Sequence, residues 1–383
     1  MSRARCLLTI LGLIALSSVI SCASIFSSRS PAMDKSGWVT HCYGRFLIDL
    51  PPQAKINAGY YLWGDNIKML DDSPEALVTR IDQREKELKS ERHKKIQGSM
   101  FLRRLDLGDG STGLLSWKSN ASVEMYLLDT YAISTPTWRA YRWKGGVTRD
   151  RETAGIESAT SLARNLRSRE ANEIPTEPGF CIDRAYIAGD SFQMEDFGIG
   201  VTFPEHPGAF LSFRSSTGAE QDRLLDRVGG FLMGAAKLVA GIETLRKRER
   251  GGAVAGEEYL LAGSAKGQRA YTFLWEAQGK DESISEPHLK AELSVEERSS
   301  DEHGNPPAPT FKSDKAALEL WDAIIDSIRL RPVSAPGRDG NAGSPSPPTG
   351  PQRMVSSPSV DDDYALEEFL AELKPKDNWM DDL

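Results

Sequence analysis

The sequence predicts an α+β protein with two tandem lobes, each an antiparallel sheet with packed helices, followed by a disordered linker and an acidic tail. Two observations predict the lobes. Short segments in which apolar and polar residues alternate, as in half-buried strands, recur between turn residues. Both halves also follow one order: a cysteine, a strand ended by proline, a long helix, further strands and a closing helix. Because the halves share little sequence identity, the repeat is one of plan.

The first lobe is expected over residues 38–172. Its opening strand alternates from Arg45 to Leu50 and stops at a Pro-Pro pair. Ser73 followed by Pro74 is typical of a helix start, since serine caps the first turn and proline fits the first helical position. This helix is expected to end near residue 92. Other strands are expected near 60–63, 98–106, 113–118, 123–134 and 137–143, with a closing helix over 156–166.

The second lobe is expected over residues 173–332. Leucines and valines spaced along residues 219–246 predict one long helix, weakened by the pair Gly229-Gly230. A closing helix is predicted over 315–330, with Trp321 facing inward. Strands are expected near 183–187, 198–203, 209–213, 257–261, 270–275 and 289–294.

The first residues are typical of a bacterial lipoprotein signal. Arg3 and Arg5 give a basic start, residues 7–19 are apolar, and a serine precedes Cys22. The apolar run is shorter than the about 20 residues of a membrane-spanning helix. We therefore expect a signal peptide over residues 1–21 and a lipid anchor on Cys22.

The anchored chain would continue through a Ser-rich tether over residues 22–37. Ala23 follows the cysteine, so there is no aspartate to retain the protein at the inner membrane. This predicts a periplasmic protein held in the inner leaflet of the outer membrane. Several acyl chains anchor a protein stably, whereas one chain alone binds only marginally.

Residues 333–383 are expected to lie outside both lobes. Residues 333–360 are rich in Pro, Gly and Ser and cannot bury a core, which predicts a flexible linker. Residues 361–383 hold nine acidic residues against two lysines, so this tail carries −7 of the chain's net charge of −8. The tail could form a short amphipathic helix that docks on a partner, or it could be a solvated segment without a specific role.

Two cysteines, Cys42 and Cys181, remain after the signal and the anchor are set aside. An oxidising compartment permits a disulfide between them. Two separate buried thiols are the alternative.

Composition and motifs argue against several functional classes. Since the chain outside the tail has nearly balanced charge and no basic stripe, nucleic acid is not expected as a partner. The five histidines lack metal-ligand spacing, and no Gly-x-Ser-x-Gly motif occurs. Residues 108–113 match Gly-x-Gly-x-x-Gly, but a strand is expected after them, so a hairpin turn explains them better than a dinucleotide loop. We predict no catalytic residue, metal, cofactor or small-molecule substrate.

Four segments together resemble the lipoprotein immunity proteins that protect bacteria against phospholipase effectors of the type VI secretion system, specifically the fourth lipase group. Their order and spacing carry the resemblance, which covers about residues 38–331. The segments are 41–51 (HCYGRFLIDLP), 179–183 (GFCID), 200–207 (GVTFPEHP), and 273–280 (FLWEAQGK) with Pro287.

The resemblance implies a two-domain protein that binds the effector in the periplasm and inhibits it by steric occlusion or by locking its lid. Within that family a surface does the work, not a catalytic set. As contact residues we expect Lys280, Asp281 and Glu286 in one loop, with Trp138 and Trp143 as aromatic anchors. An ordinary hairpin and core packing are the alternatives for these residues.

Two other functional classes remain open from the sequence. One is a periplasmic lipoprotein scaffold that docks through its acidic tail. The other is a lipid-acting enzyme whose site carries no known motif. Deleting residues 361–383 should abolish function only in the scaffold, and only the enzyme should be active alone.

Overall fold

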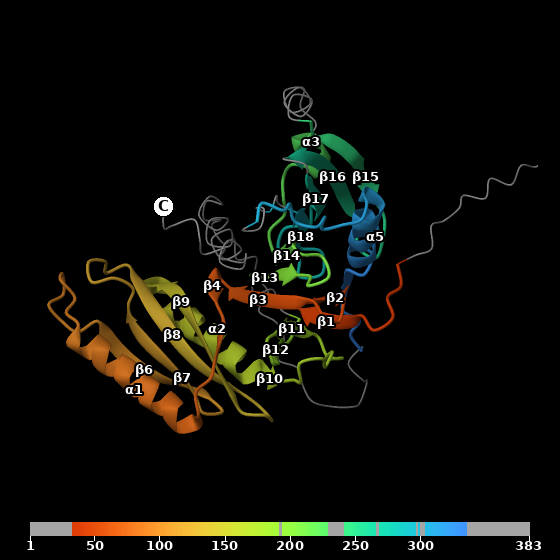
Figure 1. Cartoon of the computed structure of the whole chain (residues 1–383). Coiled ribbons are helices and arrows are strands. Elements are labelled where there is room, and N and C mark those ends of the chain that lie inside the picture. The colour runs from red at the N-terminus through yellow and green to blue at the C-terminus, as the bar shows by residue number, and fades with distance from the viewer. Residues whose placement is uncertain are drawn as a thin grey trace, which may run out of the picture. The chain divides into compact units, whose positions relative to one another are not determined.

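A computed structural model of the chain describes residues 33–190, 194–228, 241–265, 268–295, 298 and 303–334. Within these ranges antiparallel strand pairs build four sheets, with helices packed against them (Figure 1). The predicted α+β class with antiparallel sheets is confirmed. No helix in these ranges is long and apolar enough to cross a membrane. The predicted signal peptide, Cys22, nearly all of the linker and the acidic tail lie outside the described residues.

A five-stranded sheet forms most of the first half of the chain. Its β6–β7 connection is a two-residue hairpin turn, in which Asp109 and Gly110 have φ values of 51° and 78°. This turn confirms the hairpin expected from the glycine-rich segment, because a strand and not a helix follows it. In spatial order the strands are β5 (Lys68–Leu70), β9 (Arg139–Thr148), β8 (Met125–Ser134), β7 (Ser111–Trp117) and β6 (Phe101–Gly108).

Two helices pack against this sheet, α1 (Pro74–Ser90) and α2 (Glu152–Asn165), the latter preceded by a short 3-10 helix, η1 (Arg149–Arg151). The side chain of Ser73 accepts a hydrogen bond from the backbone N–H of Ala76, as expected of a cap. One face of α1 is buried, and its buried residues are Leu77, Ile81 and Leu88.

The eight-stranded sheet combines strands from both halves of the sequence. β3 pairs with β13 along its whole length, although the two strands are far apart in sequence. Their side chains and those of the central strands form the larger hydrophobic core. In spatial order the strands are β15 (Glu243–Arg250), β16 (Gly256–Ala265), β17 (Gln268–Ala277), β18 (His288–Val295), β14 (Ala209–Ser216), β13 (Glu195–Thr202), β3 (Lys55–Leu62) and β4 (Asp65–Asn66).

Two small sheets also connect distant parts of the chain. Cys42 and Cys181 form a disulfide between them, with Cα atoms 5.9 Å apart. The division into lobes over 38–172 and 173–332 stays a prediction, and strands from both sides of it share sheets. One small sheet contains β1 (Val39–Tyr43), β2 (Phe46–Leu50) and β19 (Arg329–Leu330), and the other contains β10 (Leu166–Ser168), β12 (Ala185–Ala188) and β11 (Gly179–Ile182).

Two helix predictions need correction. The closing helix α5 (Asp314–Ile325) ends before residue 330, because Arg329–Leu330 pairs with β2 as strand β19. Of the helix expected over 219–246, the described residues show α3 (Leu224–Arg227), whereas residues 243–246 belong to strand β15. The intervening residues 229–240 lie outside the described ranges. Pairing with β16 outweighs the local helical pattern, since it aligns the arginines of β15 with a buried glutamate.

Candidate interaction surface

The loop between β17 and β18 contains the three charged residues expected to contact a partner. Lys280 and Glu286 form an ion pair of 2.5 Å, with 67% and 56% of their side chains exposed. The backbone N–H of Lys280 also donates to the carbonyl of Glu286 over 2.7 Å. The loop is therefore closed on itself and presents paired charges at the surface.

Asp281 has a different role from these two residues. Its carboxylate accepts a hydrogen bond of 3.0 Å from the backbone N–H of Ala219. The backbone N–H of Glu220 donates to Gln278 over 2.9 Å, beside it. Asp281 thus helps to fix the loop to the segment before α3, and the three charged residues do not form one uniform contact set.

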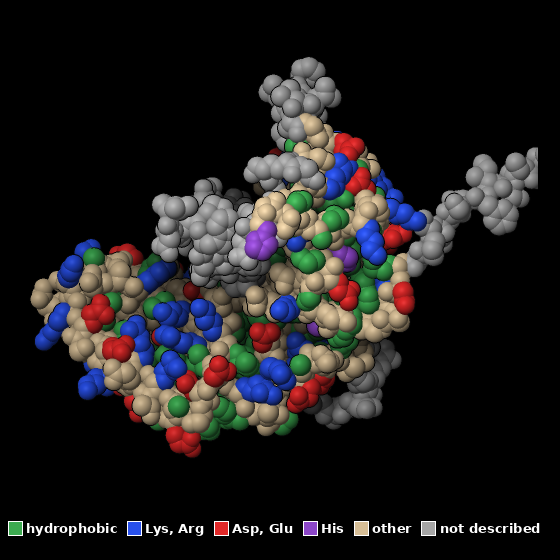
Figure 2. All heavy atoms as spheres, viewed as in Figure 1, with side chains coloured by type: hydrophobic (Ala, Val, Ile, Leu, Met, Phe, Trp, Pro, Cys, Tyr) green, Lys and Arg blue, Asp and Glu red, His purple; other side chains and the backbone are tan. Residues whose placement is uncertain are grey.

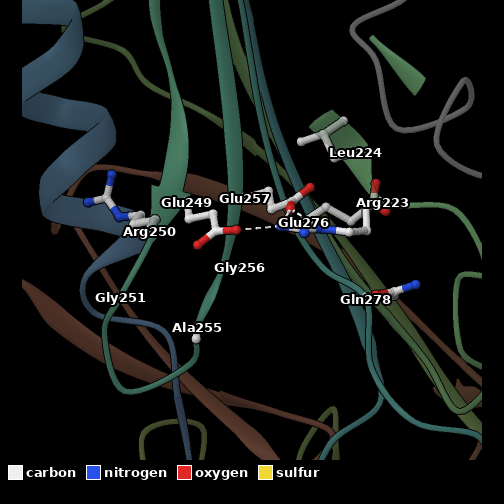
Figure 3. Close-up of a pocket in the computed structure, with 10 residues that line it drawn as sticks. All are labelled: Arg223, Leu224, Glu249, Arg250, Gly251, Ala255, Gly256, Glu257, Glu276 and Gln278. Carbon is white, nitrogen blue, oxygen red and sulfur yellow. Dashed lines mark hydrogen bonds and ion pairs between the residues drawn. The ribbon is translucent and has the colours of Figure 1, made fainter. Parts of the chain in front are cut away.

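A pocket of about 730 Å³ lies beside this loop, between the β15–β16 hairpin, β17 and the start of α3 (Figure 3). The guanidinium of Arg223 lies across it and donates to Glu249 over 2.6 Å and to Glu257 over 2.5 Å. Part of the pocket wall is therefore made of paired charges. The lining residues are Arg223, Leu224, Glu249, Arg250, Gly251, Ala255, Gly256, Glu257, Glu276 and Gln278.

Glu276 is the most buried carboxylate of the pocket lining, with 4% of the residue exposed. Burial by itself raises the pKa of the Glu276 carboxyl, but the contacts with His288 and Arg227 outweigh this and hold the pKa below its ordinary value. Arg227 contacts both carboxylate oxygens, at 2.5 and 2.6 Å. Glu276 is thus charged and paired at neutral pH.

In the described part of the chain, Glu220, Glu276 and His288 bring three potential metal-ligand atoms within 4.8 Å of one another. The prediction from sequence missed this group, because its members come from three separate segments. Two other histidines have structural partners. The Nε2 of fully buried His93 lies 2.9 Å from the Ser122 carbonyl oxygen, and the Nδ1 of His206 lies 3.2 Å from that of Thr310.

The two tryptophans expected as anchors differ in exposure. Trp143 is only 3% exposed and belongs to the larger hydrophobic core, so it is corrected from a contact residue to a core residue. Trp138 is half-buried against the core beneath α1 and stays a candidate. On the face shown in Figure 2, lysine and arginine side chains gather over the region of the five-stranded sheet and α2.

Comparisons with known proteins place these features in a family. Residues 39–135 match the sequence model of the Tle cognate immunity protein 4 N-terminal domain, and residues 173–333 match that of its C-terminal domain. The chain is also 63% identical to a chain in the crystal structure of a Tle4-Tli4 complex. It belongs to the Tle cognate immunity protein 4 family. The shared region covers 79% of this chain and 100% of that chain, with a TM-score of 0.76.

Two structures of another immunity protein are similar to this chain along their whole length. The apo structure of the immunity protein TplEi of the type VI secretion system from Pseudomonas aeruginosa is 62% identical, with a TM-score of 0.75, and covers 79% of this chain and 100% of its own. TplEi complexed with an "L" peptide is 60% identical, with a TM-score of 0.70, and covers 78% and 100%. No match was found among curated proteins.

Proposed function

We propose that this chain is a periplasmic immunity protein that binds and inhibits a phospholipase effector of the type VI secretion system, and so protects the producing cell and its kin. One observation carries the proposal: the chain is 63% identical, over the whole of that chain, to a chain of the Tle4-Tli4 complex. Inhibition by steric occlusion or lid locking needs no catalysis by the inhibitor. The purified chain alone should therefore release no fatty acid from phospholipid.

The fold suits an inhibitor that acts through a rigid surface. The disulfide and the shared sheets connect distant segments, which limits the conformational entropy that is lost on binding. A tight complex buries about 1,600 Å² in total and depends on a few well-packed residues. The proposed contacts are the exposed pair Lys280–Glu286 and the half-buried Trp138. Asp281 fixes the loop that carries Lys280 and Glu286.

Placement at the membrane belongs to the same proposal. The basic and apolar signal and Cys22 support lipid anchoring in the inner leaflet of the outer membrane. An anchored inhibitor would meet an incoming lipase where that lipase acts. Replacing Cys22 by serine should abolish incorporation of labelled palmitate, and retained labelling would contradict the anchor.

The decisive experiment combines residues 23–383 with the secreted lipase encoded nearest the gene. Co-elution at a fixed ratio, with lipase activity falling to background at that ratio, would support inhibition by binding. Unchanged activity with no complex would contradict it. Deletion of residues 361–383 should leave inhibition intact.

The contact loop has a separate test. Replacing both Lys280 and Glu286 by alanine should weaken the complex by more than about tenfold if either is a binding hot spot. The matched control replaces the exposed ion pair Lys89–Glu85 of α1. Equal affinity of both double variants would exclude the loop as a principal contact.

A further inference from the structure

Three potential metal ligands converge beside the pocket. Glu276 lies on β17, His288 begins β18, and Glu220 lies just before α3. One ligand atom from each side chain lies within 4.8 Å of the other two. Zinc ligands sit about 2.0–2.2 Å from the metal, so small side-chain rotations would bring these atoms onto one ion.

Backbone hydrogen bonds already fix the three segments to one another. The N–H of Glu220 donates to Gln278 over 2.9 Å, and that of His288 donates to Gly218 over 3.1 Å. The side-chain amide of Gln278 donates a hydrogen bond of 2.9 Å to the carbonyl of Gln221. The ligands are therefore held in place by their supporting backbone, as a selective metal site requires.

The His288 ring lies beside the carboxylate that Arg227 binds. Its Nε2 is buried and makes no hydrogen bond within the described part of the chain. The Glu276 carboxylate oxygen is 3.5 Å away, which is long for a hydrogen bond. The Nε2 is therefore available as a metal ligand.

Charge around the group favours a divalent cation. The two carboxylates carry −2, and the guanidinium of Arg227 supplies one positive charge. It lies 2.5 Å from Glu276 and 3.6 Å from Glu220, with 38% of its side chain exposed. Arg227 is thus a monovalent cation in the position that a divalent ion would take.

We propose that Glu220, Glu276 and His288 form a zinc site, which takes up the ion in exchange for Arg227. Mixed imidazole and carboxylate ligands suit zinc better than calcium or magnesium. Glu276 also lines the 730 Å³ pocket, which provides an entry path and room for water as a fourth ligand. The bound ion would join β17, β18 and the segment before α3, and so hold the loop of Lys280 and Glu286.

Calorimetric titration of chelator-treated residues 23–383 with zinc chloride tests the site without the effector. We expect one zinc ion per chain. His288→Ala should weaken binding by more than about tenfold, the loss seen even for outer ligands. Arg227→Ala should tighten it, because the competing cation is gone. His206→Ala is the matched control and should leave the affinity unchanged.

A purely structural ion pair predicts the opposite pattern. Zinc binding would then be absent, or equal in His288→Ala and the parent chain, and either result overturns the site. Equal affinity for calcium or magnesium would overturn the assignment to zinc. Cobalt can replace zinc and absorbs visible light, so it reports the ligands directly. Its spectrum should show nitrogen and oxygen ligands in the parent chain and should change in His288→Ala. Circular dichroism should show that the variant is folded, so that a changed spectrum does not reflect unfolding.

Discussion

Among the described residues, the two most buried carboxylates are Asp129 in the five-stranded sheet and Glu258 in the eight-stranded sheet, with 1% and 0% of each residue exposed. Both are neutralised by arginine, since a buried unpaired charge is very costly. Their surroundings differ in how far the ionic contacts extend.

Asp129 has a compact environment. Arg142 on the neighbouring strand β9 binds it with two hydrogen bonds of 2.8 and 2.6 Å. Arg84 of α1 approaches to 3.6 Å. Around this group the sheet and α1 are held by apolar packing, so the ionic contact is local.

Glu258 lies at the centre of a wider network. It forms ion pairs with three arginines of β15, and the indole N–H of Trp321 donates a hydrogen bond of 3.3 Å to its carboxylate. Arg246 and Arg250 also form ion pairs with Asp322 of α5, at 2.5 and 2.7 Å. The three arginine contacts with Glu258 are Arg246 at 2.7 Å, Arg248 at 2.5 Å and Arg250 at 2.6 Å.

The difference shows that ionic contacts replace apolar burial at one edge of the larger sheet. β15 reads ETLRKRER and has Leu245 as its one large apolar residue, so apolar packing alone cannot attach it. Arginines attach it to β16 and α5 instead. A charged edge strand also resists pairing with another chain.

The largest effect is expected from Glu258→Ala. It leaves three arginines without their common partner in a buried site, which should lower the free energy of unfolding by about 3–5 kcal/mol. Glu249→Ala is the control: its side chain is 74% exposed, so the loss should stay below about 1 kcal/mol. Urea unfolding of both variants measures the difference, and equal losses would contradict the network.

Asp129→Ala should cost less, about 2 kcal/mol, the value of hydrogen bonds to a charged group. Arg142 has 27% of its side chain exposed and can turn toward water once its partner is gone. Hydrogen exchange should show the loss of protection confined to β8, β9 and α1. Loss of protection across β15 and α5 as well would remove the contrast between the two groups.

Acid should affect the Glu258 network through Asp322. Burial by itself raises the pKa of the Asp322 carboxyl, but hydrogen bonds from Arg246 and Arg250 hold it below the ordinary value. The resulting stabilisation is present above the unfolded pKa of about 3.9 and is lost as pH falls through the lower folded value. Asp322→Asn should flatten the dependence of stability on pH in this range, and an unchanged slope would exclude the carboxyl as its source.

The smallest effects are expected at the helix caps, one in each region. Ser73 caps α1 and Ser313 caps α5, each by accepting a backbone hydrogen bond of 3.2 Å. Replacement by alanine should cost about 1 kcal/mol in each case. Because α5 buries more of its surface than α1, hydrogen exchange in the first turn should increase more for Ser73→Ala. The reverse order would contradict this distinction.

Elements whose signals are local were predicted from the sequence. Ser73 and Pro74 located the start of α1. The glycine-rich segment around Asp109 and Gly110 predicted a hairpin turn, and both residues adopt the positive φ of such a turn. The antiparallel α+β class followed from recurrent alternation and is confirmed.

Other features depend on partners that are distant in sequence. Trp143 resembled a surface anchor, but the core encloses it. The pairing of β3 with β13 and the group of Glu220, Glu276 and His288 also escaped prediction.

The sequence by itself determined local conformation, through capping, turn geometry and the alternation of apolar residues. Only the tertiary structure decided that β15 is a strand and which charges are buried together. The physical reason is that a segment rich in arginine gains little from its own apolar pattern. Its conformation is set by Glu258 and Asp322, which the rest of the fold brings to it.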